Sequence, residues 1–167
     1  MDKLIGRHKE QFILKNCLES GRSEFVVIYG RRRIGKTFLV RRFFNDTYDF
    51  SFVGKHDMPR EQQLADFAKT LQRYSSSEFT PELKNWTQAF DGLAKLLEAK
   101  DTSRKKVIFF DEMPWMDTPK SDFVSSLENF WNGWAAMRDD IVFVACGSAT
   151  SWMIDSLLHN QGGLFNR

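Results

Sequence analysis

The sequence predicts an α/β fold in which helices cover both faces of a mainly parallel sheet. Four short segments are typical of strands, and the segments between them repeat apolar residues every three or four positions, as helices do. Most of the strand segments are apolar throughout, which indicates strands that are buried on both faces. The strand segments lie at residues 25–29, 48–53, 107–110 and 141–146.

Two helices are expected in the first 50 residues. One spans residues 9–20, and Gly21 is a fitting end for it. The other follows the first strand and ends at Asn45–Asp46. The expected apolar faces are Phe12, Ile13, Cys17 and Leu18 in the first helix and Phe38, Leu39, Phe43 and Phe44 in the second.

Four more helices are expected in the remaining chain. Ser75–Ser77 ends the first of them, and Thr80–Pro81–Glu82 indicates that the next begins with proline at its first position. Ser121 is expected to cap a long helix, and a last helix follows Gly147–Ser148. Aromatic residues in these helices are interpreted as core. The apolar faces are Leu64, Phe67, Ala68 and Leu71; Phe90, Leu93, Ala94 and Leu97; Phe123, Leu127, Phe130, Trp131 and Trp134; and Trp152, Met153, Leu157 and Leu158.

The first strand segment runs directly into a glycine-rich loop, GRRRIGKT, which fits the phosphate-binding pattern G-x-x-x-x-G-K-[ST] in full. Its two glycines allow backbone angles at which successive N–H groups turn toward a phosphate. Lys36 supplies a positive charge to the β- and γ-phosphates, and Thr37 a hydroxyl for Mg²⁺. The helix that starts here directs its positive dipole end at the phosphates. The expected nucleotide-binding residues are Gly30, Arg31, Arg32, Arg33, Ile34, Gly35, Lys36, Thr37 and Phe38.

Two acids follow the third strand segment. Asp111 and Glu112 come directly after four apolar residues, and ligands of open α/β sheets bind at the carboxyl ends of strands. Asp111 fits the Walker B aspartate that holds Mg²⁺ beside Thr37. Glu112 is then placed to polarise an attacking water. With the phosphate loop, these acids predict a three-layer αβα sandwich of the P-loop NTPase class with ATP and Mg²⁺ as cofactors.

Charge is unevenly distributed along the chain. The net charge is +2, yet residues 1–42 hold 11 Lys or Arg against 4 Asp or Glu. A basic phosphate-binding half explains this asymmetry, and nucleic-acid contact is the alternative. The side chains of Arg31, Arg32 and Arg33 are expected to point outward while the loop backbone binds phosphate. They form a solvated face, a contact to a neighbouring subunit or a nucleic-acid patch.

Cysteine and histidine usage gives no sign of a disulfide framework or a metal site. Cys17 and Cys146 are the two cysteines, and the three histidines lack metal-ligand spacing. No apolar run approaches 18 residues, and the first residues do not form a signal peptide. We therefore expect a cytoplasmic protein without membrane contact.

Four segments together resemble the archaeal-type ATPases of the AAA+/STAND assemblage, which occur in archaea and bacteria. They are GRRRIGKT, FFDEMPWM, CGSATSWM and GGLFNR, and the likeness extends from IGRHKE near the start to the last residue. The resemblance implies an AAA+-like strand order. It also implies that family members continue past this sequence into a fifth core strand, a helical lid and a C-terminal domain that is nuclease-like in some members.

The resemblance assigns roles to further residues. Ile5–Gly6–Arg7 is similar to the opening segment that packs beside the adenine, so Ile5, Gly6 and Arg7 are expected to bind the nucleotide. Ser148 occupies the position of the sensor 1 polar residue, with Thr150 as second choice; alternatively, this serine ends the strand by bonding its own backbone. Arg167 resembles the arginine that serves as a finger in a neighbouring subunit.

Residues 1–167 are thus interpreted as a P-loop ATPase core from the N-terminal part of a longer protein, truncated before the fifth strand and the lid. Nucleic acid bound through an absent C-terminal domain and a homo-oligomer of the full-length protein are the implied partners. The leading hypothesis is Mg²⁺-dependent ATP hydrolysis, weak in the isolated fragment, with Glu112, Lys36, Ser148 and Arg167 as catalytic residues and Thr37 and Asp111 as metal ligands. The alternative is a regulatory module that holds ATP with little turnover and controls a nuclease, toxin or DNA-binding partner.

Overall fold

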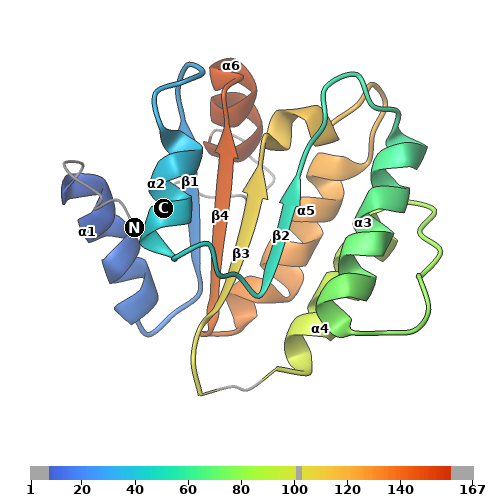
Figure 1. Cartoon of the computed structure of the whole chain (residues 1–167), viewed down its shortest axis with the longest axis horizontal. Coiled ribbons are helices and arrows are strands. Elements are labelled where there is room, and N and C mark those ends of the chain that lie inside the picture. Colours follow the sequence, from blue (N-terminus) through green and yellow to red (C-terminus); the bar gives the residue numbers. More distant parts are fainter. Residues whose placement is uncertain (1–7, 101–102, 159–167) are drawn as a thin grey trace.

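Four parallel strands form a single sheet in the computed structural model, which describes residues 8–100 and 103–158. The strands are β1 (Glu24–Tyr29), β2 (Phe50–Val53), β3 (Lys106–Asp111) and β4 (Ile141–Gly147). Their order in the sheet is β1-β4-β3-β2. The predicted α/β class, parallel sheet and strand order are confirmed, and all four strands end at the same edge of the sheet (Figure 1).

Helices cover both faces of this sheet (Figure 1). One face carries α1 (His8–Glu19) and α2 (Lys36–Phe43), and the other carries α3 (Arg60–Ser75), α4 (Trp86–Glu98) and α5 (Phe123–Gly133). Short 3₁₀ turns follow β3 at η1 (Met113–Met116) and α5 at η2 (Ala135–Met137). The short α6 (Thr150–Trp152) continues into a π-helical stretch, η3 (Met153–Leu158). None of the described helices has the length and apolar character that a membrane span requires.

The larger core lies between the sheet and helices α3 to α5 and is built from aromatic rings. The ring of Phe90 in α4 stacks on that of Phe110 in β3, with centroids 5.9 Å apart. Strands β3 and β4 are buried at every position, because helices cover them on both faces and other strands flank them. The expectation that the aromatic stripes are core is therefore confirmed for α3, α4 and α5, whereas Phe38 in α2 is 47% exposed.

Two residues of the predicted apolar face of α1 do not pack against the sheet. Leu14 and Cys17 are buried against the sheet, whereas Phe12 is 63% exposed and Ile13 46% exposed. Both spacings fit a helical period, so the pattern alone did not decide which side faces the core.

The predicted helix start at Thr80–Pro81–Glu82 is wrong. The chain has no helix between Ser76 and Asn85, and α4 begins at Trp86. The Asn85 side chain accepts a hydrogen bond from the Gln88 N–H at 2.8 Å, so asparagine supplies the cap. The cap predicted at Ser121 is one residue early, because Asp122 is the N-cap of α5. The Ser121 hydroxyl nevertheless accepts a hydrogen bond from the Phe123 N–H at 3.0 Å.

Candidate functional site

Four loops leave the carboxyl edge of the sheet and surround a pocket of about 460 Å³. Each of the four strands is followed by residues that line this pocket, so the parallel topology brings distant parts of the sequence together. The lining residues are Arg32, Arg33, Gly35, Lys36, Thr37 and Phe38 after β1, Gly54 and His56 after β2, Glu112 and Trp115 after β3, and Ser148 after β4.

The loop after β1 has a backbone that its two glycines permit. Gly30 has φ 144° and Gly35 φ 87°, both in the range that disfavours residues with a Cβ. A Cβ at Gly30 would also lie 2.7 Å from Cδ1 of Ile34. Gly35 is the N-cap of α2. Because it has no side chain to accept a hydrogen bond from the first N–H groups of that helix, these groups are available at the pocket.

Lys36 lies along the inside of this loop. Its side chain is 5% exposed, and Nζ donates hydrogen bonds of 2.7 Å to the carbonyls of Gly30 and Arg31. These partners are neutral, and no carboxylate pairs with Lys36 in the part of the chain that the structure describes. No carboxylate of the described chain therefore offsets the ammonium at the wall of the pocket.

Thr37 and Asp111 are in direct contact. The Thr37 hydroxyl donates to Oδ2 of Asp111 at 2.9 Å, and Oδ1 of Asp111 accepts the Glu112 N–H at 2.9 Å. Below them lies the buried thiol of Cys146, whose pKa is raised by burial and by the nearby Asp111 carboxylate, so the thiol stays neutral. The two residues predicted to hold a metal are thus adjacent and carry oxygen ligands.

Glu112 has an unusual backbone for a residue with a side chain. Its angles of φ 51° and ψ 41° are left-handed, a conformation that costs energy in residues other than glycine and is enriched at functional sites. The turn places its side chain at the same pocket as Lys36 and Thr37. Among the described residues, the Glu112 carboxylate has no ion-pair partner.

Ser148 lines the pocket from the end of β4. Its hydroxyl makes no hydrogen bond to any residue within 8–100 and 103–158, so the alternative in which it bonds its own backbone is not observed. Thr150, the second choice, is the first residue of α6 and does not line the pocket. Ile5, Gly6, Arg7 and Arg167 lie outside the described residues.

All three loop arginines are exposed, as expected, but Arg32 departs from the expectation that their side chains point away from the site. Arg32 and Arg33 line the pocket, whereas Arg31 does not. The guanidinium carbon of Arg32 lies 5.8 Å from the centroid of the Trp115 ring. A cation over an aromatic face is attracted by the ring quadrupole, which gives Arg32 a reason to turn inward.

Sequence reasoning missed Trp115 and His56. Their rings lie with centroids 4.3 Å apart and nearly perpendicular. Trp115 follows the two acids within FFDEMPWM, so its nearness to Glu112 was a usable signal. His56 carries no such signal, because only the pairing of β2 with β3 brings it to the site.

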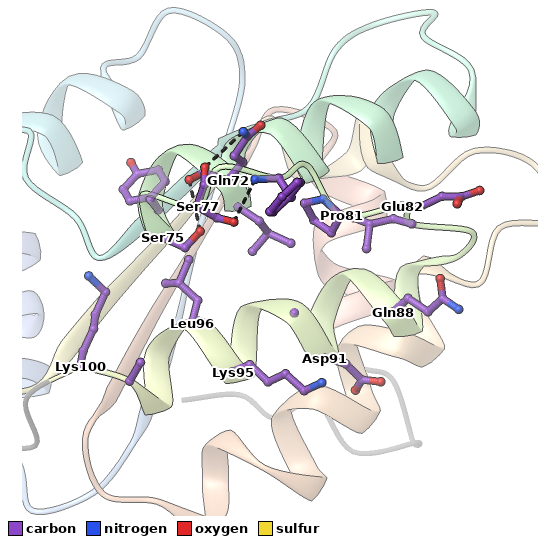
Figure 2. A pocket seen from close by; sticks show the side chains of 16 residues that line it. Gln72, Ser75, Ser77, Pro81, Glu82, Gln88, Asp91, Lys95, Leu96 and Lys100 are labelled. Atoms are coloured by element: carbon purple, nitrogen blue, oxygen red, sulfur yellow. Dashed lines mark hydrogen bonds between the residues drawn. The ribbon is translucent and has the colours of Figure 1, made fainter.

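A larger cavity of about 920 Å³ lies between α3 and α4 (Figure 2). Figure 2 shows Gln72 of α3 on one side and Asp91 and Lys95 of α4 on the other. None of the predicted nucleotide-binding residues lines it, and its charged residues carry both signs. It lacks the concentration of positive charge that a polyphosphate requires.

Comparison with known families shows the family to which the chain belongs. A family model described as an ATPase domain predominantly from Archaea matches residues 4–167. The chain belongs to this family. The resemblance drawn from the Walker motifs is thereby confirmed at the level of the ATPase domain.

Two related proteins place this ATPase domain within longer chains. An uncharacterized protein of Methanocaldococcus jannaschii, MJECL04, is 25% identical over 98% of the chain, and the match spans 34% of that protein. The structure of a Walker-type ATPase of Pyrococcus abyssi, PABY2304, superposes with a TM-score of 0.65 at 18% identity over 98% of this chain and 51% of its own. The chain thus spans about a third to a half of these relatives, and the structural likeness shows a shared fold.

Proposed function

We propose that this ATPase domain binds Mg²⁺-ATP in the pocket at the carboxyl edge of the sheet and hydrolyses it. The observation that carries the proposal is the hydrogen bond between Thr37 and Asp111 at the wall of a pocket that Lys36 and Glu112 also line. These four groups are what phosphoryl transfer to water needs: a cation for the phosphates, oxygen ligands for a metal and a base for water.

The residues present fit a magnesium ion. Mg²⁺ takes oxygen ligands and is usually held at nucleotide sites by one or two protein groups together with phosphates and water. The Thr37 hydroxyl and the Asp111 carboxylate supply such a pair. No group of three or more metal-ligating side chains occurs among the described residues, so the ion would bind with the nucleotide. When bound, it offsets negative charge on the phosphate oxygens.

The protein groups divide the remaining work. The ammonium of Lys36, which now donates to loop carbonyls, would donate to phosphate oxygens of the nucleotide. The Glu112 carboxylate would accept a proton from the attacking water, since it has no other partner in the described chain. The Ser148 hydroxyl would bond the γ-phosphate or that water. Positioning and electrostatics then suffice, without a covalent intermediate.

The two matched proteins are two to three times as long as the matched region, so the domain acts there within a larger protein. We propose that ATP turnover here also drives or switches a further domain, and that the isolated domain turns over slowly. A nucleic acid bound by that domain, a second copy of the chain and a cytoplasmic location remain part of this proposal.

Replacing Glu112 by glutamine tests the proposal. The Glu112→Gln variant should bind ATP within about twofold of the wild type and release phosphate about 100-fold more slowly, because general base catalysis contributes that much. Glu82→Gln, in the cavity between α3 and α4, is the matched control and should change neither quantity. Equal phosphate release by wild type and Glu112→Gln would contradict the role of Glu112. ATP retained for hours by the wild type without phosphate release would favour the regulatory module.

A further inference from the structure

Trp115 joins two loops of the site. It lies in η1, three residues after Glu112, and one contact of its ring is to His56 in the loop after β2. The other contact is to the guanidinium of Arg32 in the phosphate loop. All three residues line the same pocket as Lys36. The indole thus connects the loop after β1 with the loop after β2, although strands β1 and β2 are not neighbours in the sheet.

The contact with Trp115 leaves the charge of Arg32 available. An aromatic face attracts a guanidinium but does not neutralise it, and the in-plane N–H donors stay accessible. Arg32 has no carboxylate partner among the residues that the structure describes. Elsewhere in the chain, by contrast, arginines near the sheet bond carboxylates, as Arg138 does with Asp140 and Arg104 with Asp49.

We propose that Arg32 contacts the terminal phosphate of the bound nucleotide and that Trp115 is the positioning residue that holds it there. This inference rests on the proposed function. An arginine of the same chain would then neutralise charge on the transferring phosphoryl group, a task that a neighbouring subunit performs in other ATPases. The planar fork of the guanidinium suits two phosphate oxygens at once.

Two consequences follow from this placement. Because ADP lacks the terminal phosphate, Arg32 makes the site discriminate ATP from ADP. Because the arginine comes from the same chain, its contribution to turnover does not require a second copy of the chain. His56 also contacts the indole and so links the loop after β2 to the position of Arg32.

The test compares two arginines that stack on aromatic rings. Arg32→Gln removes the proposed contact, and Arg73→Gln is the matched control, since Arg73 lies 5.6 Å from the Tyr74 ring and away from the pocket. Binding of ATP and ADP is measured by calorimetry, and kcat by phosphate release. Arg32→Gln should weaken ATP binding about tenfold, as loss of a charged hydrogen bond does, and leave ADP binding within twofold. Its kcat should fall about 100-fold or more.

Trp115 variants separate positioning from general folding. Trp115→Phe keeps an aromatic face and should retain kcat within about fivefold, whereas Trp115→Leu should lower it as far as Arg32→Gln does. The double variant Arg32→Gln/Trp115→Leu should lose no more than Arg32→Gln alone, because both changes remove one interaction. Thermal unfolding of each variant, at a midpoint close to that of the wild type, shows that the fold is intact.

Two outcomes would overturn the inference while leaving the proposed function in place. They are equal losses of ATP and ADP affinity in Arg32→Gln, and kinetics of Arg32→Gln that match those of Arg73→Gln. Failure of the proposed function looks different: the wild type would bind no ATP, or Lys36→Ala would bind it as well as the wild type does.

Discussion

Charged side chains lie at both edges of the sheet, but they are paired with opposite charges at only one of them. At the amino edge, charged side chains pair with one another. Lys106 at the start of β3 is fully buried and donates to Asp140 at 2.8 Å, and Arg138 donates to both oxygens of the same carboxylate. Asp49, just before β2, accepts two bonds from Arg104 and one from the Val107 N–H.

At the carboxyl edge, charges converge without opposite partners. Lys36 bonds carbonyls, Arg32 lies over an indole, and the Glu112 carboxylate pairs with no cation in the described chain. A charge that is paired within the chain stabilises the fold, whereas grouped charges without partners favour an external ligand. Charge pairing therefore distinguishes the amino edge from the carboxyl edge, where we propose that the nucleotide binds. The cavity between α3 and α4 is larger than the pocket, so volume does not make this distinction.

The largest expected effect separates binding from stability. Lys36→Ala should weaken ATP binding about 100-fold or more, because it removes charged hydrogen bonds to phosphate. Its unfolding free energy should fall by less than about 2 kcal/mol, because loss of two bonds to loop carbonyls is partly offset by removal of a buried ammonium that has no carboxylate partner in the described chain. Calorimetry and urea unfolding measure the two quantities. Lys95→Ala, in the cavity between α3 and α4, should change neither.

The opposite pattern is expected at the amino edge. Asp140→Ala should lower the unfolding free energy by about 3 kcal/mol, because it leaves the buried Lys106 ammonium without its carboxylate. ATP affinity of the folded variant should not change. Arg41→Ala, which removes the exposed pair with Asp46, should cost less than about 1 kcal/mol. An Asp140→Ala variant that folds stably but binds ATP poorly would break the comparison between the two edges.

A smaller effect should appear in the pH dependence of stability. Hydrogen bonds from Arg138 and Lys106 outweigh burial and lower the pKa of Asp140 to about 2, against about 3.9 in the unfolded chain. A lowered pKa means that the stabilisation is complete above about pH 4 and is lost as the pH falls toward 2. Burial raises the pKa of Asp49, but bonds from Arg104 and the Val107 N–H outweigh it, so this pKa is lowered too.

Urea unfolding between pH 7 and pH 2.5 measures this decline. The Asp140→Asn variant should show a shallower fall below pH 4 than the wild type, because one group no longer takes up a proton. Parallel curves for the two proteins would mean that Asp140 does not contribute to the acid dependence.

The phosphate loop and the paired acids were predictable because their chemistry is local. Glycine spacing, a lysine and a threonine at fixed positions, and acids directly after an apolar run each depend on a few consecutive residues. The meeting of Thr37 with Asp111 followed from one general property of parallel sheets, that strands end at a common edge. The start of α4 was predicted wrongly from Pro81, because the helix begins where Asn85 caps it and Trp86 is buried.

By itself, then, the sequence determined the fold class, the strand order implied by the resemblance, and the residues that the loop and the acids contribute to the pocket. Only the tertiary structure decided that Arg32 turns inward over Trp115, that His56 meets the same ring, and that Lys106 is neutralised by Asp140. The physical reason is the separation along the chain over which each kind of interaction acts. Periodicity and turn chemistry act between near neighbours in the chain, whereas these pairings join segments whose distance is set by how the strands and loops are arranged in space.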